Sequence, residues 1–315
     1  MRALLIVNPH ATTTTPLGRD VITRALASAM ELTVVETRYR GHATQLAGTA
    51  ATAGDGLVLT LGGDGTVNEA VNGIVGASRP GDGGRPAGSR PALAPLPGGS
   101  ANVFTRALGL PADPVDAAGH ILRSLAAGRH RSIGLGLAGE RYFTFNAGLG
   151  LDAEVVRAVE GLRAQGRTAN PALYMRVALR QYYRVTDRRH PALSLERAGQ
   201  PPVDRLFLGI VSNTAPWTYL GRRAVHTNPD AGFDSGLDVF ALRRLRTAGT
   251  FKALGQMLSG RDRPPGGRQV VSLHDEARLT IRADRPVAFQ VDGEYVGERE
   301  CVTFTSVPRA LRVIA

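Results

Sequence analysis

The chain has 315 residues, of which 43% are hydrophobic, 21% charged and 5% aromatic, so it can bury a sizeable core and divide into two domains. Its net charge of +11 favours an anionic partner, a nucleic acid or a lipid surface, although an arginine-rich composition by itself also explains such a charge. Its one lysine, Lys252, is followed by Ala253, which excludes a P-loop and a protein-kinase ATP site, because each needs a lysine at a defined place.

The first third of the chain alternates short apolar runs with helical patterns. The runs predict strands at residues 3–7, 32–37, 57–61 and 92–96, the first of them buried. Apolar side chains at helical spacing predict helices after these strands, over 21–29, 42–53, 67–74 and 101–108. This alternation predicts an α/β domain with a doubly wound parallel sheet over residues 1–130.

The pattern changes after residue 130. Short extended segments separated by turns predict a C-terminal, mainly antiparallel β-sandwich domain over residues 131–303, and a last strand at about 304–315 is expected to return to the first domain. The one helix expected in this part covers 171–185. A glycine- and proline-rich run at 76–91 predicts a mobile surface loop between the early strands.

Cysteine content and hydropathy indicate the compartment. The one cysteine, Cys301, excludes an intrachain disulfide and a cysteine-rich zinc site, which fits a reducing compartment. No stretch of about 18 apolar residues is present to form a membrane span. We therefore expect a cytoplasmic protein, which could still lie on the inner face of a membrane.

The main functional motif is the glycine turn Leu61-Gly62-Gly63-Asp64-Gly65-Thr66, which runs from a buried strand into a helix. Glycines allow a phosphate to approach the backbone closely, and a helix N-terminus offers free N–H groups and a positive dipole end. A carboxylate at Asp64 would repel the phosphate unless a cation lay between them, which suggests bridging Mg²⁺. An ordinary turn with Thr66 as N-cap is the alternative.

A second turn of the same kind favours the nucleotide site over that alternative. Leu96-Pro97-Gly98-Gly99-Ser100 also connects a strand to a helix through glycines and a hydroxyl. Asn8-Pro9 and Thr37 follow the first two strands. All these loops open at the carboxyl edge of the parallel sheet, which is where such sheets bind ligands.

These motifs resemble the bacterial diacylglycerol-kinase-like lipid kinases, whose superfamily also contains sphingosine, ceramide and NAD kinases. The resemblance covers nearly the whole chain, and the order and spacing of its motifs are highly specific. It rests on GGDGTVNEAVNGI at 62–74, LPGGSANVF at 96–104, NAGLGLDAEVV at 146–156, NPDAGFDSGLDVF at 228–240 and VDGE at 291–294.

The resemblance implies ATP and Mg²⁺ as cofactors, with the ATP site between the α/β domain and the β-sandwich. It implies that Glu294 acts as general base, taking the proton of a lipid hydroxyl as this attacks the γ-phosphate of ATP, and Asp64 is the second candidate catalytic residue. By itself, VDGEYV predicts only a hairpin turn. The implied nucleotide contacts are Asn8, Thr37, Gly62, Gly63, Asp64, Gly65, Thr66, Asn68, Gly99, Ser100 and Asn102.

The chain departs from the family pattern at two places. The metal-binding loop of the family usually has paired acids before its glycine, whereas this chain has Asp234 followed by Ser235. Asp234 and Leu237 are therefore the candidate metal ligands, with one expected carboxylate replaced. The family also tends to have an acid after the asparagine of the second turn, but here Asn102 is followed by Val103.

We therefore predict an ATP- and Mg²⁺-dependent lipid kinase that phosphorylates the hydroxyl of diacylglycerol or a related lipid. The alternatives are an NAD kinase, which shares GGDGT, and a non-catalytic protein that binds lipid or nucleotide, which the change at Ser235 makes conceivable. The histidines show no metal-ligand spacing, and no G-x-S-x-G motif is present, so zinc chemistry and a serine hydrolase are unsupported.

The predicted partners are a lipid substrate and an anionic membrane surface. No nucleic acid is expected, because the basic stretch contains no recognisable nucleic-acid-binding module, and a homodimer is left open. Arg176, Arg180, Arg184 and Arg188 recur every four residues and would form one stripe on a helix. This stripe is predicted to face the membrane, the alternative being a solvated helix face in an arginine-rich protein.

Overall fold

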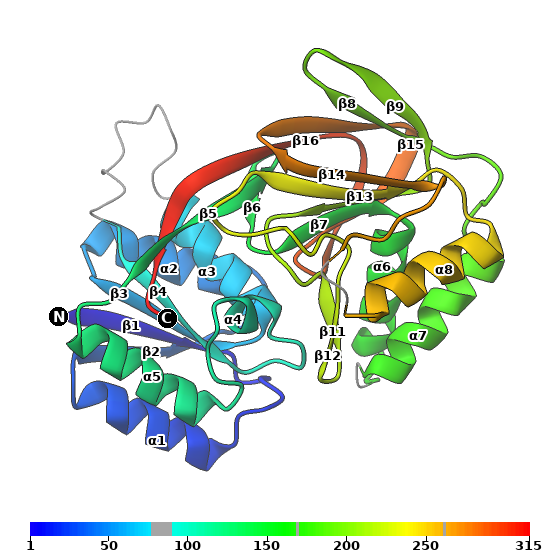
Figure 1. Ribbon diagram of the computed structural model, residues 1–315. Helices are drawn as coiled ribbons and strands as arrows, with labels where there is room; N and C mark the ends of the chain where they lie inside the picture. Colours follow the sequence, from blue (N-terminus) through cyan, green and yellow to red (C-terminus); the bar gives the residue numbers. More distant parts are fainter. Residues whose placement is uncertain (77–89, 168–169, 261–262) are drawn as a thin grey trace. The chain divides into compact units, whose positions relative to one another are not determined.

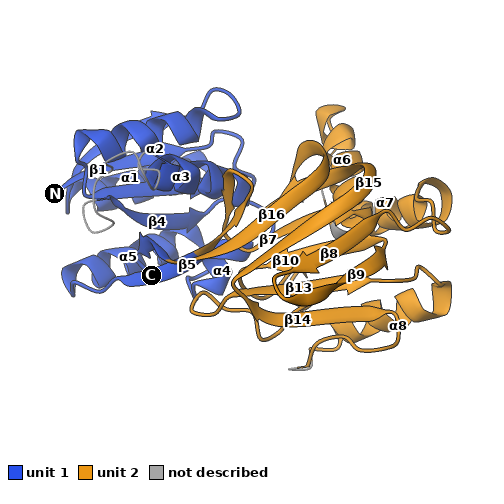
Figure 2. Ribbon diagram, turned by 90° about the horizontal axis from the view of Figure 1, so that it is seen from above, with its two compact units in different colours: residues 1–134, 309–315 blue, residues 135–308 orange. Residues whose placement is uncertain are grey.

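The computed structural model describes residues 1–76, 90–167, 170–260 and 263–315, and most of the predicted loop at 76–91 lies outside the described residues. The chain forms two compact units, shown in Figures 1 and 2. Unit 1 consists of residues 1–134 and 309–315, and unit 2 of residues 135–308. The sequence placed the boundary at residue 130 and the start of the returning segment at about 304.

Unit 1 is the predicted α/β domain. Its strands pair in parallel in the order β4-β3-β1-β2, and Val313 at the end of the chain pairs with Leu93 of β4. Its elements are β1 (Arg2–Val7), α1 (Pro16–Ala27), β2 (Glu31–Glu36), α2 (His42–Ala53), β3 (Leu57–Gly62), α3 (Asp64–Gly76), β4 (Ala92–Pro97), α4 (Val103–Ala107) and α5 (Pro114–Ala126).

Helices cover both faces of the parallel sheet. Leu5, Leu59 and Leu96 point to one face, where they pack with Ile22 of α1 and Ile121 of α5. α2 and α3 lie beside each other away from α1 and α5 (Figure 1). Every residue of β3 and β4 is buried, as expected for central strands covered on both faces. The carboxyl ends of the strands, and the turns that follow them, therefore meet at one edge.

Unit 2 is built on antiparallel strands in the order β14-β13-β10-β7-β15-β16, with β8 added to β15 and β9 to β8. Its strands are β5 (Arg131–Ala138, which begins in unit 1), β6 (Arg141–Phe143), β7 (Asn146–Gly150), β8 (Leu193–Arg197), β9 (Gln200–Leu206), β10 (Leu208–Ser212), β11 (Thr218–Leu220), β12 (Arg223–Val225), β13 (Leu237–Leu242), β14 (Val270–Glu276), β15 (Arg278–Val291) and β16 (Glu294–Val313, which ends in unit 1).

The central sheet of unit 2 has an apolar core on each face. Val211 and Val239 point to one core, which also contains residues of β8 and β15. Ile210 and Phe240 point to the opposite core, which contains Tyr182 and other helical side chains. The helices on that face are α6 (Leu151–Ala164), α7 (Pro171–Arg180), its π-helical continuation η2 (Gln181–Val185) and α8 (Thr247–Leu258).

The helices of unit 2 differ from the sequence prediction. The helix predicted at 171–185 is present, but its last turn widens into η2. α6 and α8 are two further helices, for which the sequence gives no prediction, since only 171–185 is expected to be helical in this mainly antiparallel domain. Among the described residues, no helix is long and apolar enough to cross a membrane.

Candidate active site

The two predicted glycine turns pack backbone against backbone in unit 1. The amide of Gly98 donates a hydrogen bond to the carbonyl oxygen of Gly62, with a nitrogen to oxygen distance of 2.8 Å. A Cβ atom on Gly98 would lie 2.8 Å from the nitrogen of Gly62, and one on Gly99 would lie 2.6 Å from the Cα of Gly63. These approaches leave no room for side chains, so both turns require glycine here.

Asp64 connects the first turn to the helix that follows the second. Its two carboxylate oxygens accept hydrogen bonds from the backbone amides of Val103 (3.0 Å) and Phe104 (3.1 Å), at the start of α4. Asn102 precedes α4 but makes no capping bond, because its amide group bonds Gly99 at 2.8 and 2.7 Å. Asp64, the first residue of α3, thus caps α4 from another part of the chain, and its predicted role toward a cation stays a prediction.

Thr66 ties the end of β1 to the first turn. α3 begins at Asp64, so Thr66 lies inside the helix and is not its N-cap. Its hydroxyl accepts a hydrogen bond from Asn8 Nδ2 at 3.3 Å, and a Cβ atom on Gly62 would approach this hydroxyl within 2.6 Å. The predicted residues Asn8, Gly62 and Thr66 are therefore brought together.

Other predicted nucleotide contacts differ in accessibility. Ser100 is exposed, and Thr37 is half-buried at the end of β2, where its amide donates to the carbonyl of Val7. Asn68 is fully buried, and its side-chain oxygen accepts a hydrogen bond from Asn72 at 3.2 Å. In this conformation Asn68 therefore has no surface that a nucleotide could touch.

Glu69 is a structural residue of this region that the sequence prediction missed. Its carboxylate accepts hydrogen bonds from the backbone amides of Gly41 (2.7 Å) and Ala43 (3.1 Å) at the start of α2. α2 has no acidic residue in its first turn and no side-chain cap of its own. α3 thus supplies one carboxylate, Asp64, to α4 and another, Glu69, to α2.

Glu294, the predicted general base, begins β16 in unit 2. Its carboxylate forms an ion pair with Arg141, with an oxygen to nitrogen distance of 2.8 Å, and both side chains are partly exposed. Asp292 and Gly293 have φ angles of 47° and 76°, as a two-residue type I′ hairpin turn requires. The hairpin predicted from VDGEYV is present, with Val291 opposite Glu294.

Asp292 anchors this hairpin and was also missed by the sequence prediction. Its side chain is 3% exposed and accepts four hydrogen bonds of 2.7 to 3.1 Å. The donors are the backbone amides of Thr144, Phe145 and Asn146 and the hydroxyl of Thr144. A buried carboxylate is tolerated only when it is paired or fully hydrogen-bonded, and Asp292 meets that condition. Glu294 therefore lies two residues after a side chain that these hydrogen bonds hold in place.

A buried polar network continues from the hairpin. Gln290 Nε2 donates to Asn146 Oδ1 at 2.9 Å and to Asp152 Oδ2 at 2.8 Å. Burial raises the pKa of Asp152 to about 6, an effect that the hydrogen bond from Gln290 opposes. The Asp152 carboxylate packs directly over Gly148, where a Cβ atom would lie 2.0 Å from Oδ2. This contact explains why position 148 of the NAGLGLD motif is a glycine, since any side chain there would collide with Asp152.

The predicted metal ligands, Asp234 and Leu237, lie just before β13 and at its first residue, and their role toward Mg²⁺ stays a prediction. The side chain of Asp234 is exposed, and the hydroxyl of Ser235 donates to the carbonyls of Gly232 and Gly236 in its own loop. Within the described residues, no three His, Cys, Asp or Glu side chains lie close enough together to hold a metal ion. We derive no step through a metal at this loop.

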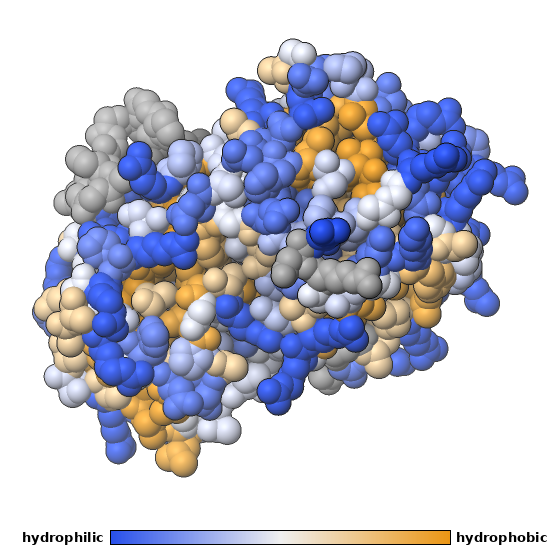
Figure 3. Space-filling view, in the orientation of Figure 1, coloured by the Kyte–Doolittle hydropathy of each residue, from blue (hydrophilic) through white to orange (hydrophobic). Residues whose placement is uncertain are grey.

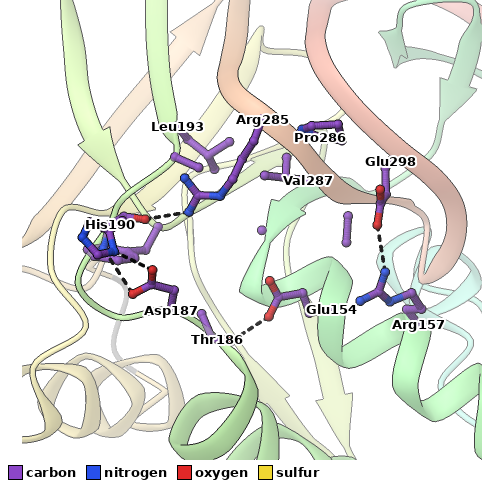
Figure 4. A pocket seen from close by; sticks show the side chains of 14 residues that line it. Glu154, Arg157, Thr186, Asp187, His190, Leu193, Arg285, Pro286, Val287 and Glu298 are labelled. Carbon is purple, nitrogen blue, oxygen red and sulfur yellow. Dashed lines mark hydrogen bonds and ion pairs between the residues drawn. The ribbon is translucent and has the colours of Figure 1, made fainter.

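Unit 2 also contains a hollow of about 180 Å³ that includes none of the predicted site residues (Figure 4). Its lining carries side chains of both charges, among them the ion pair of Arg157 with Glu298 at 3.0 Å and the contact of His190 with Asp187 at 2.6 Å.

Comparison with known proteins is consistent with the two units. Residues 2–136 match the family model described as a diacylglycerol kinase catalytic domain, and residues 146–315 match that of the YegS C-terminal NAD kinase beta sandwich-like domain. A diacylglycerol kinase of Bacillus subtilis (strain 168) is 26% identical over 306 residues, covering 94% of this chain and 90% of that protein. One from Staphylococcus aureus (strain JH9) is 26% identical, covering 100% and 92%.

The fold is also found in a solved structure. The crystal structure of a diacylglycerol kinase from Bacillus anthracis str. Sterne superposes with a TM-score of 0.69 and covers 99% of this chain and 96% of that chain. The two sequences are 21% identical. At this identity the likeness establishes the fold, and the predicted fold class is confirmed.

Proposed function

The chain belongs to the diacylglycerol kinase-like lipid kinase family, and we propose that it transfers the γ-phosphate of ATP to the hydroxyl of diacylglycerol or a related lipid. The observation that carries this proposal is the pair of glycine turns packed against each other at the carboxyl edge of the parallel sheet. Backbone amides there can approach a phosphate without interference from side chains.

In the proposed reaction, unit 1 holds the nucleotide. Gly63 and Gly65 offer backbone amides to the phosphate oxygens, with the exposed hydroxyl of Ser100 beside them. A divalent cation bound with the nucleotide would supply neutralisation of the phosphate charge. Asp64 fits a place near such a cation, because its carboxylate is negatively charged and hydrogen bonds from the amides of Val103 and Phe104 hold it beside the glycine turns.

Glu294 of unit 2 is the proposed general base. It takes the proton from the lipid hydroxyl as the hydroxyl oxygen bonds to the γ-phosphorus, while the bond from that phosphorus to the β,γ-bridging oxygen breaks and ADP leaves. The ion pair with Arg141 orients the carboxylate, and the hydrogen bonds of Asp292 fix the turn that carries it. A phosphorylated lipid is the product.

The direct test is to incubate the purified protein with labelled ATP, Mg²⁺ and a panel of lipid hydroxyl acceptors, with NAD in a parallel reaction. Labelled diacylglycerol or a related lipid supports the proposal. Label in NAD alone identifies an NAD kinase and contradicts the proposal, and label in neither contradicts it in favour of a binding protein.

A matched pair of variants separates catalysis from helix capping. Asp64→Asn and Glu69→Gln each weaken one cap supplied by α3, so each should lower stability by about 1 kcal/mol. Only Asp64→Asn should also lower turnover, by at least about a hundredfold. Equal turnover of the two variants in the kinase assay would show that Asp64 only caps α4.

A further inference from the structure

α7 and η2 expose a stripe of apolar side chains on the surface of unit 2. Val177 and Tyr182 are buried against the unit, whereas Met175, Leu179 and Tyr183, spaced four residues apart, are 37%, 38% and 48% exposed. Isolated exposed apolar residues are common on protein surfaces, but a repeated stripe along one helix indicates a contact surface.

α8 extends this apolar stripe. Its Phe251 is 42% exposed, and the ring of Tyr182 lies between it and Tyr183, with centroid distances of 6.4 Å and 4.9 Å. The hydroxyl of Tyr182 donates to the carbonyl of Leu245, just before α8, at 2.8 Å. Tyr182 therefore joins the exposed side chains of both helices into one surface, which we call the α7–α8 surface.

The charges of the α7–α8 surface are all positive. Arg176, Arg180 and Arg184 are exposed directly beside the apolar stripe, and Lys252 is exposed on α8. No acidic residue occurs in the sequence of 171–186 or 243–258. Figure 3 shows hydrophobic and hydrophilic residues interleaved where Figure 1 draws these helices.

Arg188 does not continue the predicted helical stripe, so the four-residue repeat holds only for the first three arginines. η2 ends at Val185, and Arg188 lies beyond it, where its guanidinium sits 4.9 Å from the ring centre of Tyr182. It lines an open hollow of about 560 Å³ together with Arg189 and Arg246. This hollow is wide enough for a phosphate headgroup and is bordered by three arginines and one acid, Asp187.

We propose that the α7–α8 surface docks on an anionic lipid bilayer, with Met175, Leu179 and Phe251 entering the interface and the arginines binding lipid phosphates. An apolar stripe flanked by cationic side chains is the pattern of helices that lie in a membrane interface. The charge complementarity favours a bilayer over a second copy of this chain, since two such basic surfaces would repel each other. The inference rests on the proposed function, in which the substrate is a membrane lipid.

The first test measures co-sedimentation with vesicles of phosphatidylcholine containing phosphatidylglycerol, and with phosphatidylcholine alone. Each arginine near an anionic leaflet contributes about fivefold in affinity, so the triple variant Arg176/Arg180/Arg184→Gln should bind on the order of a hundredfold more weakly at low salt. The matched control is Arg24/Arg123/Arg278→Gln, which removes the same charge at exposed sites elsewhere and should bind as the wild type does.

The second test removes the apolar contribution without changing charge. Met175/Leu179→Gln should weaken vesicle binding about tenfold at any salt concentration, because it removes apolar area that would enter the interface. Its control is Leu17/Val21→Gln, an exposed apolar pair at the same spacing on α1, beside the exposed Asp20. All four variants change exposed side chains, and their folded state is checked by thermal melting.

The outcomes are independent of the kinase assay, because vesicle binding needs neither ATP nor turnover. Kinase activity on diacylglycerol dispersed in detergent should be equal in the arginine variant and the wild type, whereas activity on anionic vesicles should fall with binding. Wild-type binding by the arginine variant at low salt would overturn the proposal. Equal losses of vesicle binding in the α7 variants and in their controls would also overturn the proposal, as would dimerisation of the protein through the α7–α8 surface.

Discussion

Asp292 should be a main determinant of the stability of unit 2. Its carboxylate accepts three backbone amides and one hydroxyl in a site that is 3% exposed. In Asp292→Asn, an NH2 group takes the place of one carboxylate oxygen, here Oδ2. Oδ2 accepts two hydrogen bonds, from the backbone amide and the hydroxyl of Thr144, and an NH2 group cannot accept either of them. The variant thus loses two hydrogen bonds to a charged acceptor and leaves two donors facing another donor.

The size of the effect follows from these two bonds. A hydrogen bond to a charged group contributes about 1.5 to 3 kcal/mol, so we expect the loss of two such bonds to destabilise the variant by about 3 to 6 kcal/mol. For a unit of this size that corresponds to a decrease in melting temperature on the order of 10 °C. Turnover should also fall at temperatures where the variant is folded, because the turn that carries Glu294 loses its anchor.

The assay is urea unfolding followed by circular dichroism, with Asp284→Asn as the control. Asp284 is an exposed aspartate in the same unit, and its change should alter the free energy of unfolding by less than about 0.5 kcal/mol. If Asp292→Asn were as stable as this control, the hydrogen-bond argument for the hairpin would be refuted.

The other predictions concern the base, the glycine turns and Asp152. Glu294→Gln should lower turnover at least about a hundredfold while ATP affinity, measured by calorimetry, stays unchanged; parallel losses of both would mean that Glu294 is a nucleotide or structural residue. Gly98→Ala should reduce both stability and ATP affinity, because its Cβ would lie 2.8 Å from the nitrogen of Gly62. Gly161→Ala in α6 is the control: its Cβ would have no atom within 4 Å, so the change should stabilise the protein by about 0.5 to 1 kcal/mol in thermal melts. Because the pKa of Asp152 is raised to about 6 in the folded state, the folded protein is more stable at low pH. Its free energy of unfolding falls by up to about 3 kcal/mol as pH rises from 4 to 7. Asp152→Asn should therefore show a smaller loss over this range in urea titrations, and an identical pH profile would disprove the assignment.

The sequence by itself determined the strands of unit 1 and its two glycine turns. Both depend on local properties: the runs around Leu5, Leu59 and Leu93 are almost entirely apolar because both faces of a central parallel strand are covered. Gly62 and Gly98 mark the ends of strands because only glycine allows the backbones to meet. The hairpin at Asp292-Gly293 was also visible, since Asp-Gly is a local turn signal.

The helices of unit 2 were less visible in the sequence. α6 contains Val155 and Val156, β-branched residues that also suit a strand. α8 begins Thr-Ala-Gly-Thr-Phe, in which only Ala248 is a strong helix former, and packs through Ala253 and Met257 against the rest of unit 2. Packing against the sheet therefore decides these segments, as tertiary context often overrides propensity.

Only the tertiary structure decided what the acids of the motifs do. Asp64 accepts hydrogen bonds from amides 39 and 40 residues further along the chain. Glu69 accepts them from amides 26 and 28 residues before it, and Asp292 from amides 146 to 148 residues before it. Each carboxylate satisfies amides at the end of an element that becomes its neighbour only when the sheet and helices assemble. No spacing along the chain encodes that proximity, because the donors are backbone groups, which every residue except proline carries.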